Sequence, residues 1–251
     1  MFMNSEVDNN YLSNAPLKEV IFEMHWDLDF IPNNNSFIDF GFDQALFDFQ
    51  RNCGFENVEI LNHVSSPLNI VSHRFYRNIN TFPIYQMGPG VFTVNDNNKN
   101  YTWIEFKKII LDGINCLKDS YKNKEISPSK VELRYIDAVA IDIFGQQDDK
   151  FEFIEKYLSI ETPKFNFLGE PLLDVSFTNR YKANENTYLN FSVSTGVDNL
   201  TNEDVLIWHT YLNNSQRIPW EGIDNWIEES HSLASDKFKK MINPKLYELF
   251  K

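Results

Sequence analysis

The 251-residue sequence lacks the short motifs by which several large enzyme classes are recognised. Its nine glycines form no G-x-x-x-x-G-K loop, and Gly88-Pro89-Gly90 is not followed by the spacing of a dinucleotide-binding turn. Neither a G-x-S-x-G nor an H-E-x-x-H sequence occurs, and the histidines and cysteines show no metal-ligand spacing. The sequence therefore predicts no metal and no cofactor, and it favours a protein that is not an enzyme.

Long apolar runs are also missing. The most apolar stretches, such as Ile109–Leu111, are interrupted by charge within a few residues, whereas a spanning helix needs about 20 apolar residues. Residues 1–14 show neither the basic nor the apolar part of a signal peptide. We therefore expect no membrane segment and a cytoplasmic protein. Cys53 and Cys116 lie far apart, and although they could pair, free buried thiols are the favoured state in that compartment.

Basic residues are few beside the acidic ones. The 23 lysines and arginines against 36 aspartates and glutamates leave a net charge of −13. This balance repels a phosphate backbone, so general nucleic-acid binding is not expected, although a local basic site is compatible with it. Apolar residues make up 42% of the chain, which is enough for a sizeable core in one large domain or two small ones.

The first half of the chain shows a clear order of strand and helix patterns. Alternation over Glu19–Leu28 predicts a strand with one buried and one wet face. Helical spacing follows over Phe42–Phe49 and ends at Cys53-Gly54. A capping box that begins at Thr102 precedes a long apolar stripe, which predicts a helix over Trp103–Tyr121. Between the two helices we expect strands at Val71–Asn78, Ile84–Met87 and Val91–Asn95.

The second half repeats this order. Alternation over Lys130–Ile141 predicts a strand, and a last long helix is expected from about Asp224 to Ile242. Both long helices are expected to open with the same tripeptide, at Trp103–Glu105 and Trp226–Glu228. The remaining expected elements are a helix at Phe151–Ile160, strands at Leu173–Tyr181, Tyr188–Thr195 and Val205–Leu212, and a short helix near Pro244.

This repetition predicts an α+β fold built from two similar units within one continuous domain. The first unit, β-α-β-β-α, covers residues 1–127, and the second, β-α-β-β-β-α, covers residues 128–251. Their strands are expected to form one long antiparallel sheet with the helices packed on one face. The two units should superpose, with Trp103 and Trp226 in equivalent places.

Charged residues gather on the polar side of the first strand of each unit. Glu19, Glu23 and His25 lie there in the first unit, and Glu132 and Arg134 lie there in the second. If the two strands are neighbours, Arg134 can bridge to Glu19 or Glu23. One interpretation is a polar floor that binds an anionic or polar ligand or a partner. The other, commoner arrangement is a solvated face whose charges pair across strands.

Two further titratable residues depart from their surroundings. Asp137 shares the apolar face of its strand with Leu133 and Val139, and a buried carboxylate needs hydrogen bonds or a cation, or else its pKa rises. It could be a tuned acid or base, although a structural role is commoner. His231 lies beside the apolar stripe of the last long helix, where a boundary residue is commoner than a proton-transfer group.

Three segments resemble an uncharacterised, sporadically distributed prokaryotic family of conserved hypothetical proteins. They are Asn14–Glu23, similar to N-A-P-L-x-E-V-x-F-E; Leu133–Asp137, similar to L-R-Y-I-N; and His231 with Phe238, similar to an H-x6-F ending. The chain departs from the pattern at Asp137, where the family has Asn, and this favours a structural role for that residue. The resemblance implies no activity, and the patchy distribution of the family implies an accessory role in genome defence or toxin control.

These observations favour a non-catalytic binding protein that engages a protein partner through the sheet face or an edge strand. The alternative is a small-molecule-binding protein or an enzyme whose pocket lies between sheet and helices and uses Glu19, Glu23, Arg134 and His231. The candidate binding residues are Glu19, Glu23, His25, Glu132, Arg134 and His231.

Overall fold

The structure is a computed structural model that describes residues 12, 14–61, 69–78, 81–122, 124–145, 150–160, 174–198, 200–214 and 216–251. The elements of the first half are β1 (Leu17–Trp26), β2 (Asp29–Ile31), β3 (Ser36–Ile38), α1 (Phe42–Cys53), β4 (Asn57–Ile60), β5 (His73–Tyr76), β6 (Ile84–Gly88), β7 (Val91–Asp96) and α2 (Trp103–Ser120). Those of the second half are β8 (Pro128–Ala140), α3 (Lys150–Tyr157), β9 (Ser176–Lys182), β10 (Thr187–Val197), β11 (Asp204–Asn214), α4 (Trp220–Met241) and α5 (Pro244–Phe250).

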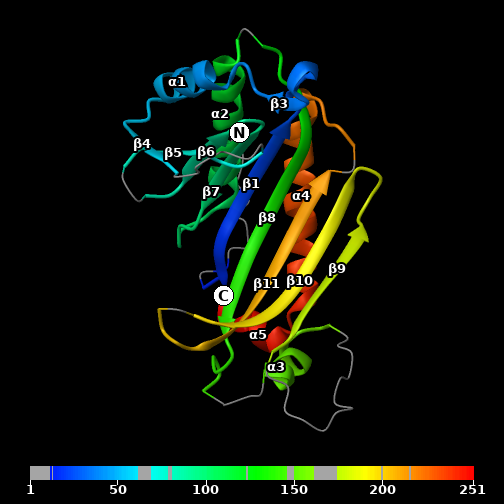
Figure 1. Ribbon diagram of the computed structural model, residues 1–251. Coiled ribbons are helices and arrows are strands. Elements are labelled where there is room, and N and C mark those ends of the chain that lie inside the picture. The colour runs from blue at the N-terminus through cyan, green and yellow to red at the C-terminus, as the bar shows by residue number, and fades with distance from the viewer. Residues whose placement is uncertain are drawn as a thin grey trace, which may run out of the picture.

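Nine of the strands form one antiparallel sheet in the order β4-β5-β6-β7-β1-β8-β11-β10-β9 (Figure 1). β1 and β8, the first strands of the two halves, lie side by side at its centre, and the later strands of each half extend outward from them. The expected α+β class and long antiparallel sheet are therefore confirmed. The element order also repeats between the halves, with a strand, a helix, an antiparallel run of strands and a long helix in each.

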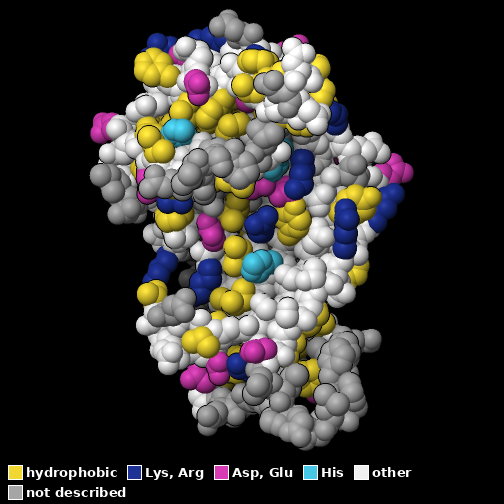
Figure 2. All heavy atoms as spheres, in the orientation of Figure 1, with side chains coloured by type: hydrophobic (Ala, Val, Ile, Leu, Met, Phe, Trp, Pro, Cys, Tyr) yellow, Lys and Arg dark blue, Asp and Glu magenta, His cyan; other side chains and the backbone are white. Residues whose placement is uncertain are grey.

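The helices cover one face of this sheet, and the core lies between the two layers. Val20, Phe22 and Met24 of β1 point into it, as the alternation of that strand predicts, and all three are fully buried. Phe106 and Ile110 of α2 pack against the same cluster. Figures 1 and 2 show the sheet from its other side, which faces away from these helices.

The two long helices also contact each other. Nζ of Lys107 in α2 lies 2.7 Å from a carboxylate oxygen of Asp224 and 2.8 Å from one of Glu228, both in α4. Their ion pairs require the two helices to lie on the same side of the sheet, as the duplicated order predicts.

The start of α4 differs from the expectation. The helix begins at Trp220, so Trp226 lies six residues inside it, whereas Trp103 is the first residue of α2. Trp226 is buried, and Trp103 is only partly buried. The shared tripeptide therefore does not mark the start of both helices, and the expectation that α4 opens with it is wrong. Pro219 serves as the N-cap residue and holds an extended backbone, which sets the earlier start.

Local signals in the first half are confirmed more closely. Thr102 is the N-cap of α2, and its side chain accepts a hydrogen bond from the backbone N–H of Glu105. Gly54 ends α1 in the left-handed conformation that favours glycine. Strands β2, β3 and β4 were not expected, because each has only three or four residues and shows little alternation.

A buried carboxylate connects the end of β1 to the end of α2. The side chain of Asp39 is fully buried and accepts hydrogen bonds from Trp26 Nε1 at 3.0 Å, Tyr121 Oη at 2.8 Å and Lys124 Nζ at 3.0 Å. The backbone N–H of Gly41 donates a fourth. A buried charge is tolerated only when it is satisfied in this way, so this network fixes the segment between β3 and α1 against the core.

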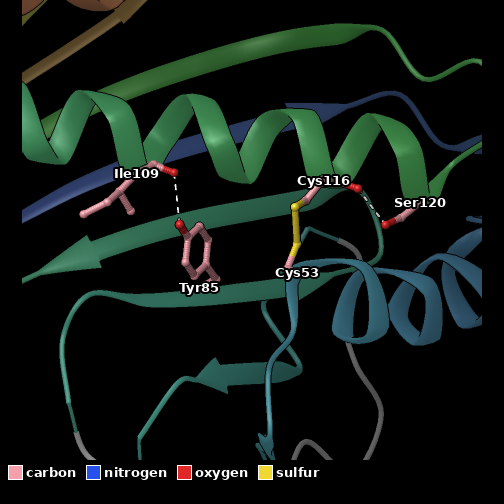
Figure 3. Close-up of a disulfide and its surroundings, with 5 residues drawn as sticks. All are labelled: Cys53, Tyr85, Ile109, Cys116 and Ser120. Atoms are coloured by element: carbon pink, nitrogen blue, oxygen red, sulfur yellow. Dashed lines mark hydrogen bonds between the residues drawn. A yellow bond between two sulfur atoms is a disulfide. The ribbon is translucent and has the colours of Figure 1, made fainter.

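The two cysteines form a disulfide between Cys53, the last residue of α1, and Cys116 of α2 (Figure 3). The expectation of free thiols is therefore wrong. The pairing could not be read from spacing, because 63 residues separate the cysteines and only the packing of α1 on α2 brings them together. Nearby, Tyr85 Oη donates a hydrogen bond to the carbonyl of Ile109, which ties β6 to the same helix.

Thiol titration tests the disulfide. We expect purified, non-reduced protein denatured in guanidinium to react with no thiol reagent, and reduced protein to expose both Cys53 and Cys116. Cys53→Ser with Cys116→Ser should lower the free energy of unfolding by about 2–5 kcal/mol, because the link no longer restricts the unfolded chain. Two reactive thiols in the non-reduced protein would contradict the pairing.

The core beneath the sheet is tested by shortening one side chain. Ile110→Ala should lower the free energy of unfolding, measured by urea denaturation, by about 2–5 kcal/mol, because Ile110 is fully buried between α2 and the sheet. Ile104→Ala is the matched control, since Ile104 is 77% exposed on the same helix. A loss below about 1 kcal/mol for Ile110→Ala would mean that α2 is peripheral.

Candidate functional site

The face of the sheet that points away from the helices, called the open face below, carries five of the six candidate residues. β1 contributes Glu19, Glu23 and His25 to it, and β8 contributes Glu132 and Arg134. Glu23 lies directly opposite Glu132 in the β1–β8 pair. The expectation that the first strands of the two halves bring these charges together is therefore confirmed.

Glu132 lies at the centre of this cluster. Its side chain is 2% exposed and contacts Lys130 Nζ, and a second oxygen lies 3.6 Å from Nη2 of Arg134. Tyr211 of β11 donates a hydrogen bond to the same carboxylate. The guanidinium of Arg134 also lies 5.0 Å from the centre of the Tyr211 ring. An arginine–carboxylate pair exists, but its acid is Glu132 of the same strand, two residues from Arg134, and neither Glu19 nor Glu23.

The other two acids have different partners. Glu19 accepts a hydrogen bond from Asn95 of β7 at 2.8 Å. Glu23 is bound to Nε2 of His25 at 2.7 Å. Burial alone would raise the pKa of Glu23, but the hydrogen bond and charge of His25, with the charges of Arg134 and Lys130, outweigh it and lower that pKa. Glu23 is therefore held as a carboxylate within a positive surrounding.

His231 lies on the opposite side of the sheet from the other candidates. Its ring is stacked on Trp103 at 4.0 Å, and Nδ1 lies 2.8 Å from Oη of Tyr135, which points toward the helices. Tyr135 and Arg134 are neighbours in β8, so their side chains point to opposite faces. The expected pocket that combines Glu19, Glu23 and Arg134 with His231 is therefore wrong. His231 joins the two long helices to the sheet.

Asp137 lies on the helix side of β8, as its place in the alternation predicts. It is 5% exposed, and burial raises its pKa to about 7. The side chain of Trp208, directly opposite on β11, offsets this rise in part. Among the described residues, Asp137 belongs to no group of three or more histidine, cysteine, aspartate or glutamate side chains that could hold a metal ion. We interpret Asp137 as a buried residue of the second half of the core.

Outside the six candidates, the open face contains a second group of residues. Tyr211 of β11 pairs with Asn190 of β10, which in turn pairs with Arg180 of β9. The guanidinium of Arg180 lies 4.2 Å from the centre of the Tyr188 ring, also on β10. These strands were predicted from the sequence, but the side chains on their polar side were not among the candidate residues. The signal was present, because Tyr188 and Asn190 alternate with the buried Leu189.

The two halves of the open face differ in exposure. On the first half, Gln86 of β6 and Thr93 of β7 are buried. On the second half, β9 is almost wholly exposed, and Tyr188, Asn190, His209 and Tyr211 of β10 and β11 are half-buried. Figure 2 shows basic side chains over this second half, in a broad surface without a deep opening.

Two other surface features lie away from the open face. A shallow hollow of about 430 Å³ lies on the helix side and is lined by Trp103, Ile104 and Glu228 among others. The β2–β3 hairpin exposes about half of Phe30 and of its cross-strand neighbour Phe37. Exposed aromatic pairs of this kind can belong to contact surfaces, so this hairpin is a candidate docking surface besides the open face.

Comparison with known proteins adds no family. A scan against protein-family models gives no match, and no curated protein is significantly similar to the chain. Among the described residues, no helix is long and apolar enough to cross a membrane.

The raised pKa of Asp137 predicts how stability depends on pH. In the unfolded chain the carboxyl ionises near pH 4, and in the folded protein near pH 7, so stability should fall as the pH rises from about 4 to about 7 and then level off. Asp137→Asn removes this loss. We expect urea denaturation to show that the variant has a higher free energy of unfolding than the wild type. This difference should grow over the same pH range, to at most about 4 kcal/mol at pH 8. Asp236→Asn, an exposed residue of α4, is the control and should show no such gain.

A destabilising Asp137→Asn at pH 8 would contradict this account. It would show that the ionised carboxylate is bound by a partner in the core.

Proposed function

We propose that the protein is a non-catalytic binding protein that engages a partner protein through the second half of its open face. The observation that carries the proposal is the presence of two arginine–tyrosine pairs, Arg134 with Tyr211 and Arg180 with Tyr188, on a helix-free surface. Tyrosine and arginine are the residue types most enriched among side chains that dominate binding energy. The resemblance to a sporadic prokaryotic family extends the proposal to an accessory role in defence or toxin control.

The side chains of this face are ordered before a partner arrives. Arg134 is held between Glu132 and the Tyr211 ring, and Tyr211 is held by its hydrogen bond to Glu132. Each of these residues also lies on a strand with neighbours on both sides. A preorganised side chain loses less conformational entropy on binding, which raises affinity for a given contact area.

Arg134 contributes little to the stability of the folded protein. Its side chain is 35% exposed, and a partly exposed ion pair contributes only about 0–1 kcal/mol. Removing it also leaves no orphaned charge, because Glu132 keeps Lys130 and Tyr211 as partners. A residue of small structural value in the middle of an accessible face is well suited to a role in binding.

Affinity purification from the native host tests the proposal. We expect the wild-type protein to retain one partner in stoichiometric amount, and Arg134→Ala and Arg180→Ala each to reduce its recovery about tenfold, with thermal stability nearly unchanged. Arg51→Ala is the matched control, because Arg51 also lies over an aromatic ring, that of Phe47, and pairs with Asp48, but on α1. It should retain the partner.

Two outcomes would overturn the proposal. Undiminished recovery with both open-face variants would remove the open face as the docking surface. Loss of the partner with Phe30→Ser and Phe37→Ser, but with neither open-face variant, would move the docking site to the β2–β3 hairpin.

A further inference from the structure

The second half of the open face differs in charge from the rest of the protein. Strands β8, β11, β10 and β9 place five charged side chains on it, and four of them are basic: Lys130, Arg134, Arg180 and Lys182, with Glu132 as the single acid. This surface therefore carries a net charge of +3 in a chain whose net charge is −13. The one acid is also buried beneath Lys130 and Arg134.

Two of the basic residues have no acid beside them among the described residues. Within the described residues, neither Arg180 nor Lys182 lies within 4 Å of a carboxylate, and both belong to the exposed strand β9. On β11, burial lowers the pKa of His209, and the nearby charge of Arg134 lowers it further.

The spacing of the two arginines is set by the sheet. Arg134, Tyr211, Asn190 and Arg180 are successive cross-strand partners, so they form one row across β8, β11, β10 and β9. Three strand spacings of about 4.8 Å place the Cα atoms of the two arginines about 14 Å apart. In an extended chain, side chains four residues apart point the same way and lie about 13 Å apart. Two acidic residues at that spacing would reach both guanidinium groups.

We propose that the open face binds an acidic, extended segment of the partner protein, with one carboxylate on Arg134 and a second, four residues away, on Arg180. This inference rests on the proposed function and specifies the chemistry of the partner. Guanidinium groups bind carboxylates in a bidentate manner, and Asn190 between them can hydrogen-bond to the backbone of the segment. The rings of Tyr211 and Tyr188 lie beside the guanidinium groups of Arg134 and Arg180 and help to hold them in place.

A nucleic acid is the less favoured occupant of the same surface. The four basic residues could contact a few phosphates, but the strongly negative charge of the whole chain opposes a longer polyanion. Glu23 of β1 also lies directly beside Glu132 and limits the basic surface on that side. A short segment with two carboxylates fits the local charge without meeting this repulsion.

Fluorescence anisotropy with designed probes tests the inference on the full chain. The first probe is a labelled serine- and tyrosine-containing peptide with two glutamates four residues apart, and the second has glutamine at both places. A third has its two glutamates adjacent, and a fourth is a short labelled oligothymidylate. We expect the first peptide to bind about tenfold more tightly than the second and third, with affinity that falls as salt is raised.

Variants test whether binding of the first peptide depends on the row of residues from Arg134 to Arg180. Arg134→Ala and Arg180→Ala should each weaken binding of the first peptide about tenfold, whereas Arg51→Ala and Lys240→Ala, elsewhere on the surface, should leave it unchanged. Circular dichroism checks that each variant is folded. Equal binding of the glutamate and glutamine peptides, or no binding of either, would overturn the inference. Tighter binding of the oligothymidylate would overturn it in favour of single-stranded nucleic acid.

This outcome is separable from that of the proposed function. If Arg134→Ala abolishes capture of the host partner while no acidic peptide binds, the docking face stands and the acidic segment is wrong. If the acidic peptide binds through the row but the host partner is retained by both open-face variants, the charge selectivity stands and the proposed function is wrong.

Discussion

The pairing of β1 with β8 is the contact on which the rest of the structure depends. These two strands begin the two halves of the chain, and their antiparallel pairing joins the halves into one sheet. Its register places Phe22 opposite Leu133 on the helix side and Glu23 opposite Glu132 on the open side. A slip of one residue would send every one of these side chains to the wrong face, so burial of the core strongly selects this register.

From this register follow two faces with different chemistry. On the helix side, buried polar groups have structural roles: Asp39 accepts four hydrogen bonds, and His231 stacks on Trp103 and contacts Tyr135. On the open side, the central acid Glu132 orders Arg134 and Tyr211 without neutralising the face as a whole. The polar groups on the helix side stabilise the fold, whereas those on the open side are accessible to a partner.

The basic residues on the second half of the open face make the proposed binding of an acidic segment compatible with the acidic net charge of the chain. Net charge acts at long range and is screened within about 10 Å at ordinary ionic strength. Contact chemistry acts at a few ångströms, and the proposed acidic segment would there meet Arg134, Arg180 and Lys182, which the sheet places on one surface. The negative net charge can therefore slow non-specific association with other acidic proteins, while the local basic surface still allows specific binding of an acidic segment.

Local patterns determined most of the elements. Alternation in β1 and β8, the capping box at Thr102 and the glycine at position 54 act within a few residues, so they could be read from the sequence without knowledge of the rest of the chain. The same alternation correctly placed Glu23 and Arg134 on the wet face and Asp137 on the buried one. It also sufficed to predict an α+β fold with its helices on one side.

Contacts between distant segments were decided only by the tertiary structure. The disulfide of Cys53 with Cys116 depends on how α1 packs on α2. His231 lies on the far side of the sheet from Arg134 because its helix covers the other face, and no spacing between the two residues reveals this. The row from Arg134 to Arg180 exists because β8, β11, β10 and β9 pair in that order, and strand order depends on packing across the whole sheet.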